Sequence, residues 1–230
     1  MVGQFFIQYI FTFIFNSKYY PNVDLNIVST HEYQNKLNDF ILDHTLIILL
    51  IISIVFIPLF YSIYRKYQVK CNKFNVLKYL LIALLFAFIY NLYLSIITDY
   101  KVSTLPIYIQ IISSGIIGPI LEELLFRGIV YNKLKEFNSI KKSMIISTII
   151  FSLMHFSIID SIYTLFIGYL LVYVYEKSKN LKYPIIIHIC INTSVIVVGL
   201  FINLNIVLNI LLLFITLIIE FILVKGELHE

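Results

Sequence analysis

The chain has 230 residues, 60% of them hydrophobic, and a mean hydropathy of +0.92. This apolar content is far above the roughly half that is usual in soluble domains, and it excludes an ordinary water-soluble protein. The net charge of +4 is modest, and lysine and arginine lie in short segments between apolar runs, which argues against a nucleic-acid partner.

The first 44 residues form an apolar segment followed by an external polar segment. Residues 1–16 lack the charged leading region and the small-residue cleavage site of a removable signal peptide, so we expect them to stay attached. An interfacial helix and a tilted first membrane crossing both fit this short stretch. The polar segment runs from Ser17 to His44.

Seven apolar runs follow, each approaching or passing the roughly 18 to 20 residues that a helix needs to cross a bilayer. They lie at about 45–64, 79–98, 107–132, 143–158, 161–176, 184–203 and 205–225. The runs are continuous, whereas strands of a β-barrel would alternate in polarity. The sequence therefore predicts an all-α, polytopic transmembrane bundle of seven or eight helices over residues 45–230.

Basic residues favour one orientation of this bundle. Thirteen of the seventeen basic residues fall in alternate loops and near the C-terminus, namely Arg65, Lys66, Lys70, Lys73, Lys78, Lys133, Lys135, Lys141, Lys142, Lys177, Lys179, Lys182 and Lys225. Because lysine and arginine are retained on the cytoplasmic side, these loops and the C-terminus are expected there, with residues 17–44 outside. The protein is thus predicted to be a multi-pass cell-membrane protein surrounded by lipid.

Three charged residues interrupt the apolar run at 107–132. A charge at this depth costs at least ~2.5 kcal/mol, so Glu122, Glu123 and Arg127 should face the bundle interior. Glu123 and Arg127 are four apart and can pair, whereas Glu122 is rotated by about 100° around the helix. Glu122 is therefore the candidate general base. The alternative is that Glu123 and Arg127 form a structural ion pair that joins helices, while water in a cavity solvates Glu122.

Two later runs each contain a histidine. Phe151 and His155 share one helix face, as do His188 and Asn192. A single membrane histidine is more often a packing residue, but several intramembrane polar residues together favour a functional site. At 1.5 Å per residue from the predicted cytoplasmic ends, these polar groups and Glu122 lie ~6 to ~18 Å deep, so one cavity in the inner half of the membrane could hold them.

This set of side chains suits hydrolysis of a peptide bond. A carboxylate, two imidazoles and an amide can activate water, stabilise an oxyanion and protonate a leaving amine. Alternatively, Glu122, His155 and His188 could bind zinc, since two histidines and a glutamate form an established catalytic zinc set. An ion-coupled transporter uses similar residues, although the inverted repeat expected of one is not visible.

The three motifs resemble those of the CAAX protease and bacteriocin-processing (CPBP, or Abi) intramembrane proteases. That family's motifs are Glu-Glu-x-x-x-Arg, Phe-x-x-x-His and His-x-x-x-Asn, and here they occupy residues 122–127, 151–155 and 188–192 in the same order. The resemblance covers roughly residues 107–203. Family members are named metalloproteases, but a glutamate-activated water without metal is also argued for them, so zinc and no cofactor both stay open.

The resemblance also implies a role for each motif residue. Glu122 would activate the hydrolytic water with help from His155, while His188 and Asn192 would stabilise the oxyanion. The residues expected to hold the geometry of the site are Glu123, Arg127 and Phe151. The active cavity would open toward the cytoplasmic leaflet.

Activities in this family range from cleaving prenylated CAAX tails to processing peptide signals and bacteriocin self-immunity. The sequence therefore predicts an intramembrane endopeptidase acting on a membrane-associated protein or peptide, without specifying the substrate. Small size and the lack of accessory domains favour a bacterial member. The alternative is a non-enzymatic membrane protein, either an ion-coupled transporter or a bacteriocin immunity protein, in which the same polar cluster is structural.

Overall fold

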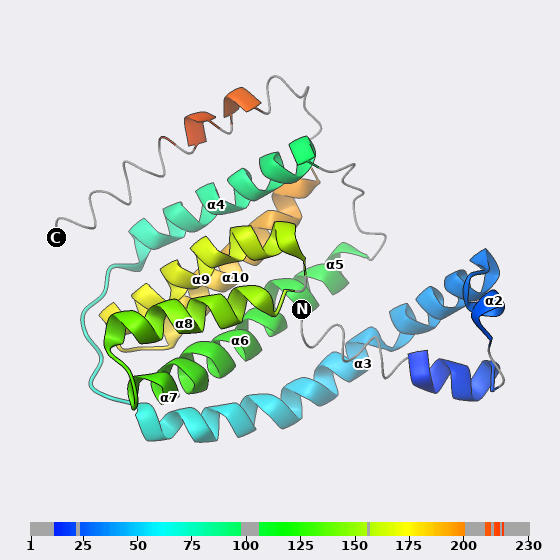
Figure 1. Cartoon of the computed structure of the whole chain (residues 1–230), viewed down its shortest axis with the longest axis horizontal. Helices are drawn as coiled ribbons and strands as arrows, with labels where there is room; N and C mark the ends of the chain where they lie inside the picture. The colour runs from blue at the N-terminus through cyan, green and yellow to red at the C-terminus, as the bar shows by residue number, and fades with distance from the viewer. Residues whose placement is uncertain are drawn as a thin grey trace.

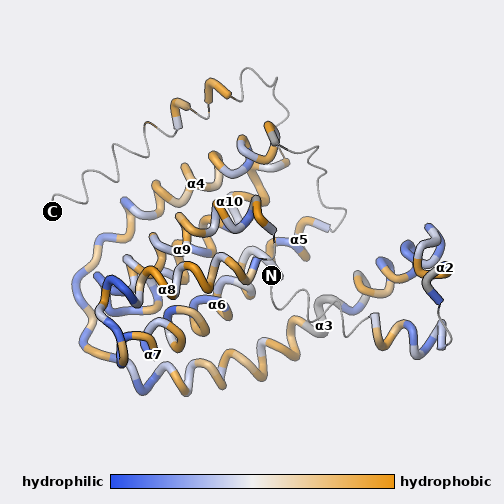
Figure 2. Tube along the Cα trace, in the orientation of Figure 1, coloured by the Kyte–Doolittle hydropathy of each residue, from blue (hydrophilic) through white to orange (hydrophobic). Residues whose placement is uncertain are grey.

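The computed structural model describes residues 12–21, 24–97, 106–155, 157–200, 210–212, 214–216 and 218. Every regular element in these ranges is a helix, which confirms the all-α class. Long helices lie side by side in a bundle, and an N-terminal hairpin of helices projects away from it (Figure 1). Hydrophobic residues run along the bundle helices, and hydrophilic ones gather in the connections at one end (Figure 2).

The first long helix begins well before the apolar run that predicted it. After the short α2 (Leu25–Val28), α3 spans His31–Tyr64, and the Thr30 side chain caps it by accepting a hydrogen bond from the Tyr33 backbone N–H. Much of the predicted external polar segment is therefore helical, because this cap, together with acidic Glu32 in the first turn, lets the helix start in polar sequence. A single 3₁₀ turn, η1, continues the chain after Tyr64.

The main core of the bundle joins α4 (Val76–Ile97), α9 (Ile158–Ser178) and α10 (Lys182–Gly199). Its buried residues are Tyr79, Ile82, Ala83, Ile167, Leu171, Val174, Ile187 and Ile191. This packing fixes α10, and with it the His-x-x-x-Asn motif, against two neighbouring helices.

The helix that carries the Glu-Glu-x-x-x-Arg motif alternates between α and π geometry. Its successive segments are α5 (Ile107–Gln110), η2 (Ile111–Ile117), α6 (Gly118–Glu123), η3 (Leu124–Tyr131) and α7 (Asn132–Lys135), of which η2 and η3 are π-helical. Short π-helical segments are rare and often occur at functional sites, because they redirect side chains and carbonyl groups. Here the two π segments flank the pair of glutamates.

The Phe-x-x-x-His motif lies where α8 (Ile140–Leu153) gives way to α9. Ser139 caps α8 by accepting from the Lys142 backbone N–H, and Ser157 caps α9 by accepting from the Asp160 backbone N–H. His155 lies in the short connection between the two helices. The turn thus places a histidine at the end of one helix and a carboxylate at the start of the next.

Four helices within the described residues are long and apolar enough to cross a membrane. They are Leu49–Tyr67, Val76–Ile96, Ile107–Lys135 and Lys182–Gly199. α8 and α9 are helical, as two of the predicted runs required, but are not among the four. Residues 1–11 and most of the predicted crossing at 205–225 lie outside the described residues, so a total of seven or eight stays a prediction.

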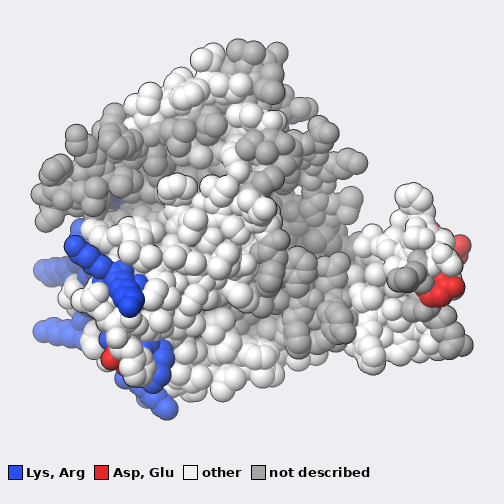
Figure 3. All heavy atoms as spheres, viewed as in Figure 1, with Lys and Arg blue, Asp and Glu red and all other residues white. Residues whose placement is uncertain are grey.

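The outer surface of the bundle fits a membrane environment. Large hydrophobic side chains are exposed on several helices, for example Leu77, Leu153 and Phe166. Lysine and arginine side chains gather at the end of the bundle where the basic loops lie (Figure 3). An apolar surface with charge concentrated at one end is what a multi-pass membrane protein requires.

A close contact between η2 and α10 yields a stability prediction. A Cβ added at Gly115 would lie 2.8 Å from Thr193 Cγ2, and the Thr193 hydroxyl donates a hydrogen bond of 2.6 Å to the Ile189 carbonyl oxygen. Because threonine is stiff at χ1 and this bond holds its rotamer, we expect Gly115→Ala to destabilise the protein by about 1 to 3 kcal/mol. Thermal unfolding in detergent measures the effect.

Gly128→Ala is the matched control, since an added Cβ there would lie 3.4 Å from its nearest neighbour, Tyr64 Cβ, an ordinary contact. We expect this variant to unfold at nearly the wild-type temperature. If the unfolding temperatures of the two variants fell by the same amount, the packing argument for Gly115 would be contradicted.

Candidate active site

A buried ion pair lies at the base of the site. Arg127 Nη1 is 2.8 Å from Glu123 Oε1, and the two side chains are 1% and 0% exposed. The Arg127 Nη2 group also donates to the Gly168 carbonyl oxygen at 3.0 Å, and the guanidinium lies 4.3 Å from the centre of the Phe151 ring. The ion pair expected from the four-residue spacing is present. The further contacts of Arg127 with Phe151 and Gly168 link η3 to α8 and α9.

The same glutamate holds His188. Glu123 Oε1 is 2.8 Å from His188 Nδ1, while His188 Nε2 lies 3.8 Å from Glu122 Oε2. The Glu123 carboxylate, ionised in its pair with Arg127, can only accept hydrogen bonds. His188 Nδ1 must therefore be the donor and carry a proton. His188 Nε2 is thereby directed toward Glu122, and the two adjacent glutamates contact different nitrogens of one ring.

His155 is oriented by its own motif. Its Nδ1 lies 3.0 Å from the Phe151 carbonyl oxygen, which can only accept, so this nitrogen donates. The Phe151 ring contacts both histidines edge-on, with centroid distances of 5.0 Å to His155 and 5.9 Å to His188. Phe151 is therefore packed among His155, His188 and Arg127, which explains a phenylalanine four residues before the histidine.

Asn192 is held by the π-helical segment η2. Its Nδ2 group donates to the Ser114 carbonyl oxygen at 2.9 Å. An amide nitrogen carries two N–H groups, so one more donor remains on Asn192 after this contact. The bond joins α10 to the helix that carries the glutamates.

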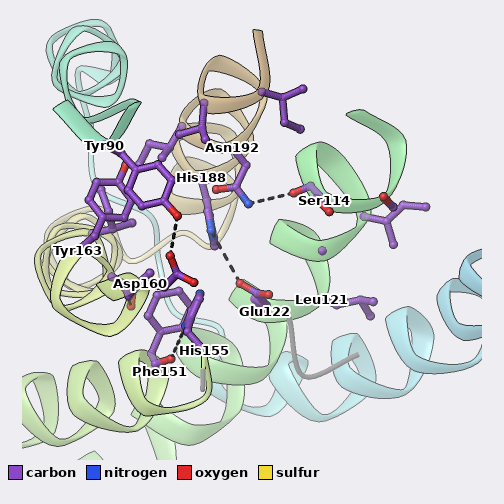
Figure 4. Close-up of a pocket in the computed structure, with 18 of the residues that line it drawn as sticks. Tyr90, Ser114, Leu121, Glu122, Phe151, His155, Asp160, Tyr163, His188 and Asn192 are labelled. Carbon is purple, nitrogen blue, oxygen red and sulfur yellow. Dashed lines mark hydrogen bonds and ion pairs between the residues drawn. The ribbon is translucent and has the colours of Figure 1, made fainter. Parts of the chain in front are cut away.

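The candidate catalytic residues line one cavity of about 260 Å³. Glu122, His155, His188 and Asn192 all contribute to its wall, and Figure 4 shows their side chains converging on it. Most of the remaining lining is apolar, from residues of α3, η2, α6, α9 and α10. Glu123 and Arg127 do not line the cavity and lie behind it, whereas Phe151 reaches its wall.

A pair of hydrogen-bonded polar residues in the cavity was not singled out from sequence. Tyr90 of α4 donates from its hydroxyl to Asp160 Oδ1 at 2.6 Å, and both residues line the cavity. The sequence contains one indication of Asp160, since it is a carboxylate five residues after His155 and lies between two apolar runs. No sequence signal links this carboxylate to Tyr90, which is 70 residues away.

The proposed zinc ligands do not form a metal site. Within the described part of the chain, no three histidine, cysteine, aspartate or glutamate side chains are grouped so that they could hold a metal ion. His188 Nδ1 contacts Glu123 and His155 Nδ1 contacts the Phe151 carbonyl oxygen, which leaves Nε2 as the nitrogen of each ring that could reach a metal. The set Glu122, His155 and His188 nevertheless does not fit a three-ligand zinc centre, because the three side chains are not grouped so that they could hold a metal ion.

Comparisons with known proteins agree with the motif resemblance. Residues 104–194 match the family described as type II CAAX prenyl endopeptidase Rce1-like. The chain is 33% identical over 92 residues to "Putative membrane peptidase YdiL" of Bacillus subtilis (strain 168), covering 40% of this chain and 38% of that protein. It is 37% identical over 103 residues to "Membrane-embedded CAAX protease MroQ" of Staphylococcus aureus (strain USA300), covering 40% of this chain and 39% of that protein.

Residues 104–194, which contain all three motifs, are similar to the Rce1-like family, and this match confirms the resemblance to the CPBP proteases. The chain spans about two fifths of the length of these curated relatives. No solved structure matches it significantly.

Proposed function

We propose that the protein is an intramembrane endopeptidase that hydrolyses a peptide bond in a membrane-associated protein or peptide. The observation that carries this proposal is the cavity in which Glu122, His155, His188 and Asn192 meet, with Glu122 Oε2 only 3.8 Å from His188 Nε2. A carboxylate and hydrogen-bonding groups facing one enclosed space are what water-mediated peptide hydrolysis requires.

In the proposed reaction, Glu122 accepts a proton from a water molecule while the water oxygen forms a bond to the scissile carbonyl carbon. The resulting oxyanion accepts hydrogen bonds from the remaining Asn192 N–H and from protonated His188 Nε2. The proton held by Glu122 then passes to the leaving nitrogen, with His155 assisting, and the C–N bond breaks to give a carboxylic acid and an amine.

Glu123 and Arg127 act through His188 in this proposal. Because Glu123 holds Nδ1 of the imidazole at 2.8 Å, the positive charge of the ring with both nitrogens protonated is stabilised next to a carboxylate. Arg127 in turn fixes that carboxylate and contacts Phe151. Phe151 packs against both imidazoles, so the three residues together set the orientation of the rings.

We also propose that the site faces the cytoplasmic half of a bacterial cell membrane. The support is the concentration of lysine and arginine at one end of the bundle, which positive-inside topology assigns to the cytoplasm (Figure 3). The two relatives are bacterial proteins named as a membrane peptidase and a membrane-embedded CAAX protease, which favours the same setting.

Cleavage of defined peptides by the purified protein tests the proposal. Synthetic single-span peptides and peptides with a C-terminal lipid anchor would be reconstituted with the protein in liposomes, and products identified by mass spectrometry. His188→Ala is expected to lose cleavage, whereas the exposed Glu136→Gln, outside the cavity, should retain it. Cleavage that persists at the wild-type rate in His188→Ala would instead support the non-enzymatic alternatives.

Metal removal is a separate prediction. Because the donor groups do not form a three-ligand site, we expect cleavage to proceed at an unchanged rate after treatment with a zinc chelator. The measurement is the initial cleavage rate before and after chelation and after zinc is added back. A rate that falls on chelation and recovers with zinc would show that the ligands rearrange to bind the metal.

A further inference from the structure

One of the two cavity histidines lies outside regular helix, in the turn between α8 and α9. α8 ends at Leu153, and His155 follows in the connection, from which its side chain lines the cavity (Figure 4). The His155 backbone N–H donates to the Ser152 carbonyl oxygen at 3.1 Å, three residues back. The position of this imidazole therefore depends on how firmly the turn itself is held.

Two serines on either side of this turn form a pair of reciprocal hydrogen bonds. Ser152 Oγ donates to the Ser161 carbonyl oxygen at 2.6 Å, and Ser161 Oγ donates to the Ser152 carbonyl oxygen at 3.1 Å. We call this pair the serine clasp. It joins the last turn of α8 to the first turn of α9, so both ends of the connection that carries His155 are fixed to each other.

The serine clasp and the histidine share one acceptor. The Ser152 carbonyl oxygen has two lone pairs and receives both the His155 backbone N–H and the Ser161 hydroxyl. Ser152 is 2% exposed, so little solvent competes for these bonds. A shift of either helix end would move the carbonyl group to which the His155 backbone is bonded.

The α9 end of the serine clasp is itself anchored to the core of the bundle. Asp160, the residue before Ser161, accepts a hydrogen bond of 2.6 Å from the Tyr90 hydroxyl of α4. α4 and α9 pack together with α10 in the main core. The clasp therefore connects the turn that carries His155 to the helix that carries the His-x-x-x-Asn motif.

We propose that Ser152 and Ser161 are positioning residues that hold His155 in place for peptide hydrolysis. The inference deepens the proposed peptidase function and rests on it. Neither serine lines the cavity, so each acts through the backbone of the turn and not by touching the substrate. A histidine displaced by about an ångström would assist proton transfer to the leaving nitrogen poorly, while the substrate would still bind.

Cleavage kinetics separate this positioning role from substrate binding. We expect Ser161→Ala to lower kcat by about ten- to a hundredfold with KM nearly unchanged, the effect of a misplaced catalytic group. The Ser152 carbonyl oxygen keeps its bond from the His155 N–H in this variant, so the fold should be retained. Ser161→Thr keeps the hydroxyl and should recover most of the rate.

Ser143→Ala is the matched control. Ser143 is also a buried serine of α8, but its hydroxyl has no hydrogen-bond partner among the described residues. We expect this variant to keep the wild-type kcat. If Ser143→Ala lowered kcat as much as Ser161→Ala, the loss would come from removing any buried serine hydroxyl, and the proposal would be overturned.

NMR of the imidazoles observes the positioning without any turnover. Protein with ¹⁵N-labelled histidine would be compared in detergent micelles as wild type, Ser161→Ala and Ser152→Ala, with the His155 signals assigned by their loss in His155→Gln. Removing the clasp should shift or broaden the His155 signals. The His188 signals should stay unchanged, because Glu123 holds that ring independently.

The two measurements distinguish failure of the serine clasp from failure of the peptidase. Altered His155 signals with unchanged His188 signals would support the clasp even if no peptide were cleaved. Wild-type His155 signals in the folded serine variants would overturn the proposal, whatever their cleavage rates. Ser152→Ala removes the other bond of the clasp and provides the same comparison if Ser161→Ala does not fold.

Discussion

Glu122→Gln is expected to reduce kcat/KM for peptide cleavage by about 10² to 10⁴-fold, the usual contribution of a general base. Glutamine has nearly the same size and keeps the polar contacts of the side chain, but its amide cannot accept a proton from water. The change leaves the ion pair of Glu123 and Arg127 untouched, because that pair uses a different carboxylate. The expected loss is therefore one of chemistry, with the fold retained.

The measurement compares initial cleavage rates of wild type, Glu122→Gln and Glu136→Gln at equal concentrations of folded protein. Glu136 is the matched control because its side chain lies at the surface, paired with Lys133 outside the cavity. Folding is checked by thermal unfolding in the same detergent. A folded Glu122→Gln variant that cleaves at the wild-type rate would remove Glu122 from the mechanism; a variant that is inactive only because it unfolds would point to a structural role.

The sequence was most informative where spacing along one helix decides the geometry. A separation of four placed Glu123 beside Arg127 and Phe151 beside His155, and both contacts are present. Depth estimates also placed Glu122 level with residues of two later helices, and these residues do line one cavity. Such predictions succeed because rise and rotation per residue are nearly constant in a helix.

Other features of the site depend on contacts that spacing does not encode. The π-helical segments η2 and η3 arise from a local change of hydrogen-bond register that residue patterns did not show. The link between Tyr90 and Asp160 joins residues 70 positions apart, and Asp160 looked like part of a loop between two apolar runs. Tertiary packing of α4 against its neighbours creates this part of the cavity.

Helix ends were also poorly predicted where polar sequence continues a helix. Apolar content placed the start of the first bundle helix near residue 45, whereas α3 begins at His31. The extra turns pack on an aromatic cluster that includes Phe15 and Tyr33, and the Tyr33 hydroxyl donates to Asn16 Oδ1. Hydropathy finds the part of a helix that can lie in lipid, and capping and local packing decide where the helix starts.

Arg127→Met is expected to cause the largest loss of stability, about 3 to 5 kcal/mol, because it leaves the buried Glu123 carboxylate without its cation. Glu123 Oε2 already has no hydrogen-bond partner among the described residues, so Oε1 and its contacts with Arg127 and His188 stabilise the charge. The effect would be measured as the free energy of unfolding in mixed detergent micelles titrated with a denaturing detergent.

Lys133→Met provides the comparison, since Lys133 forms an ion pair with Glu136 at the surface, where solvent screens the interaction. This variant should unfold almost like the wild type. Combining Arg127→Met with Glu123→Gln should recover much of the lost stability, because the double change no longer buries an uncompensated charge. The double variant should nevertheless cleave poorly, since Glu123 no longer presents a carboxylate to His188 Nδ1. Recovery of stability without recovery of activity would separate the ion pair's contribution to folding from its role in orienting the imidazole.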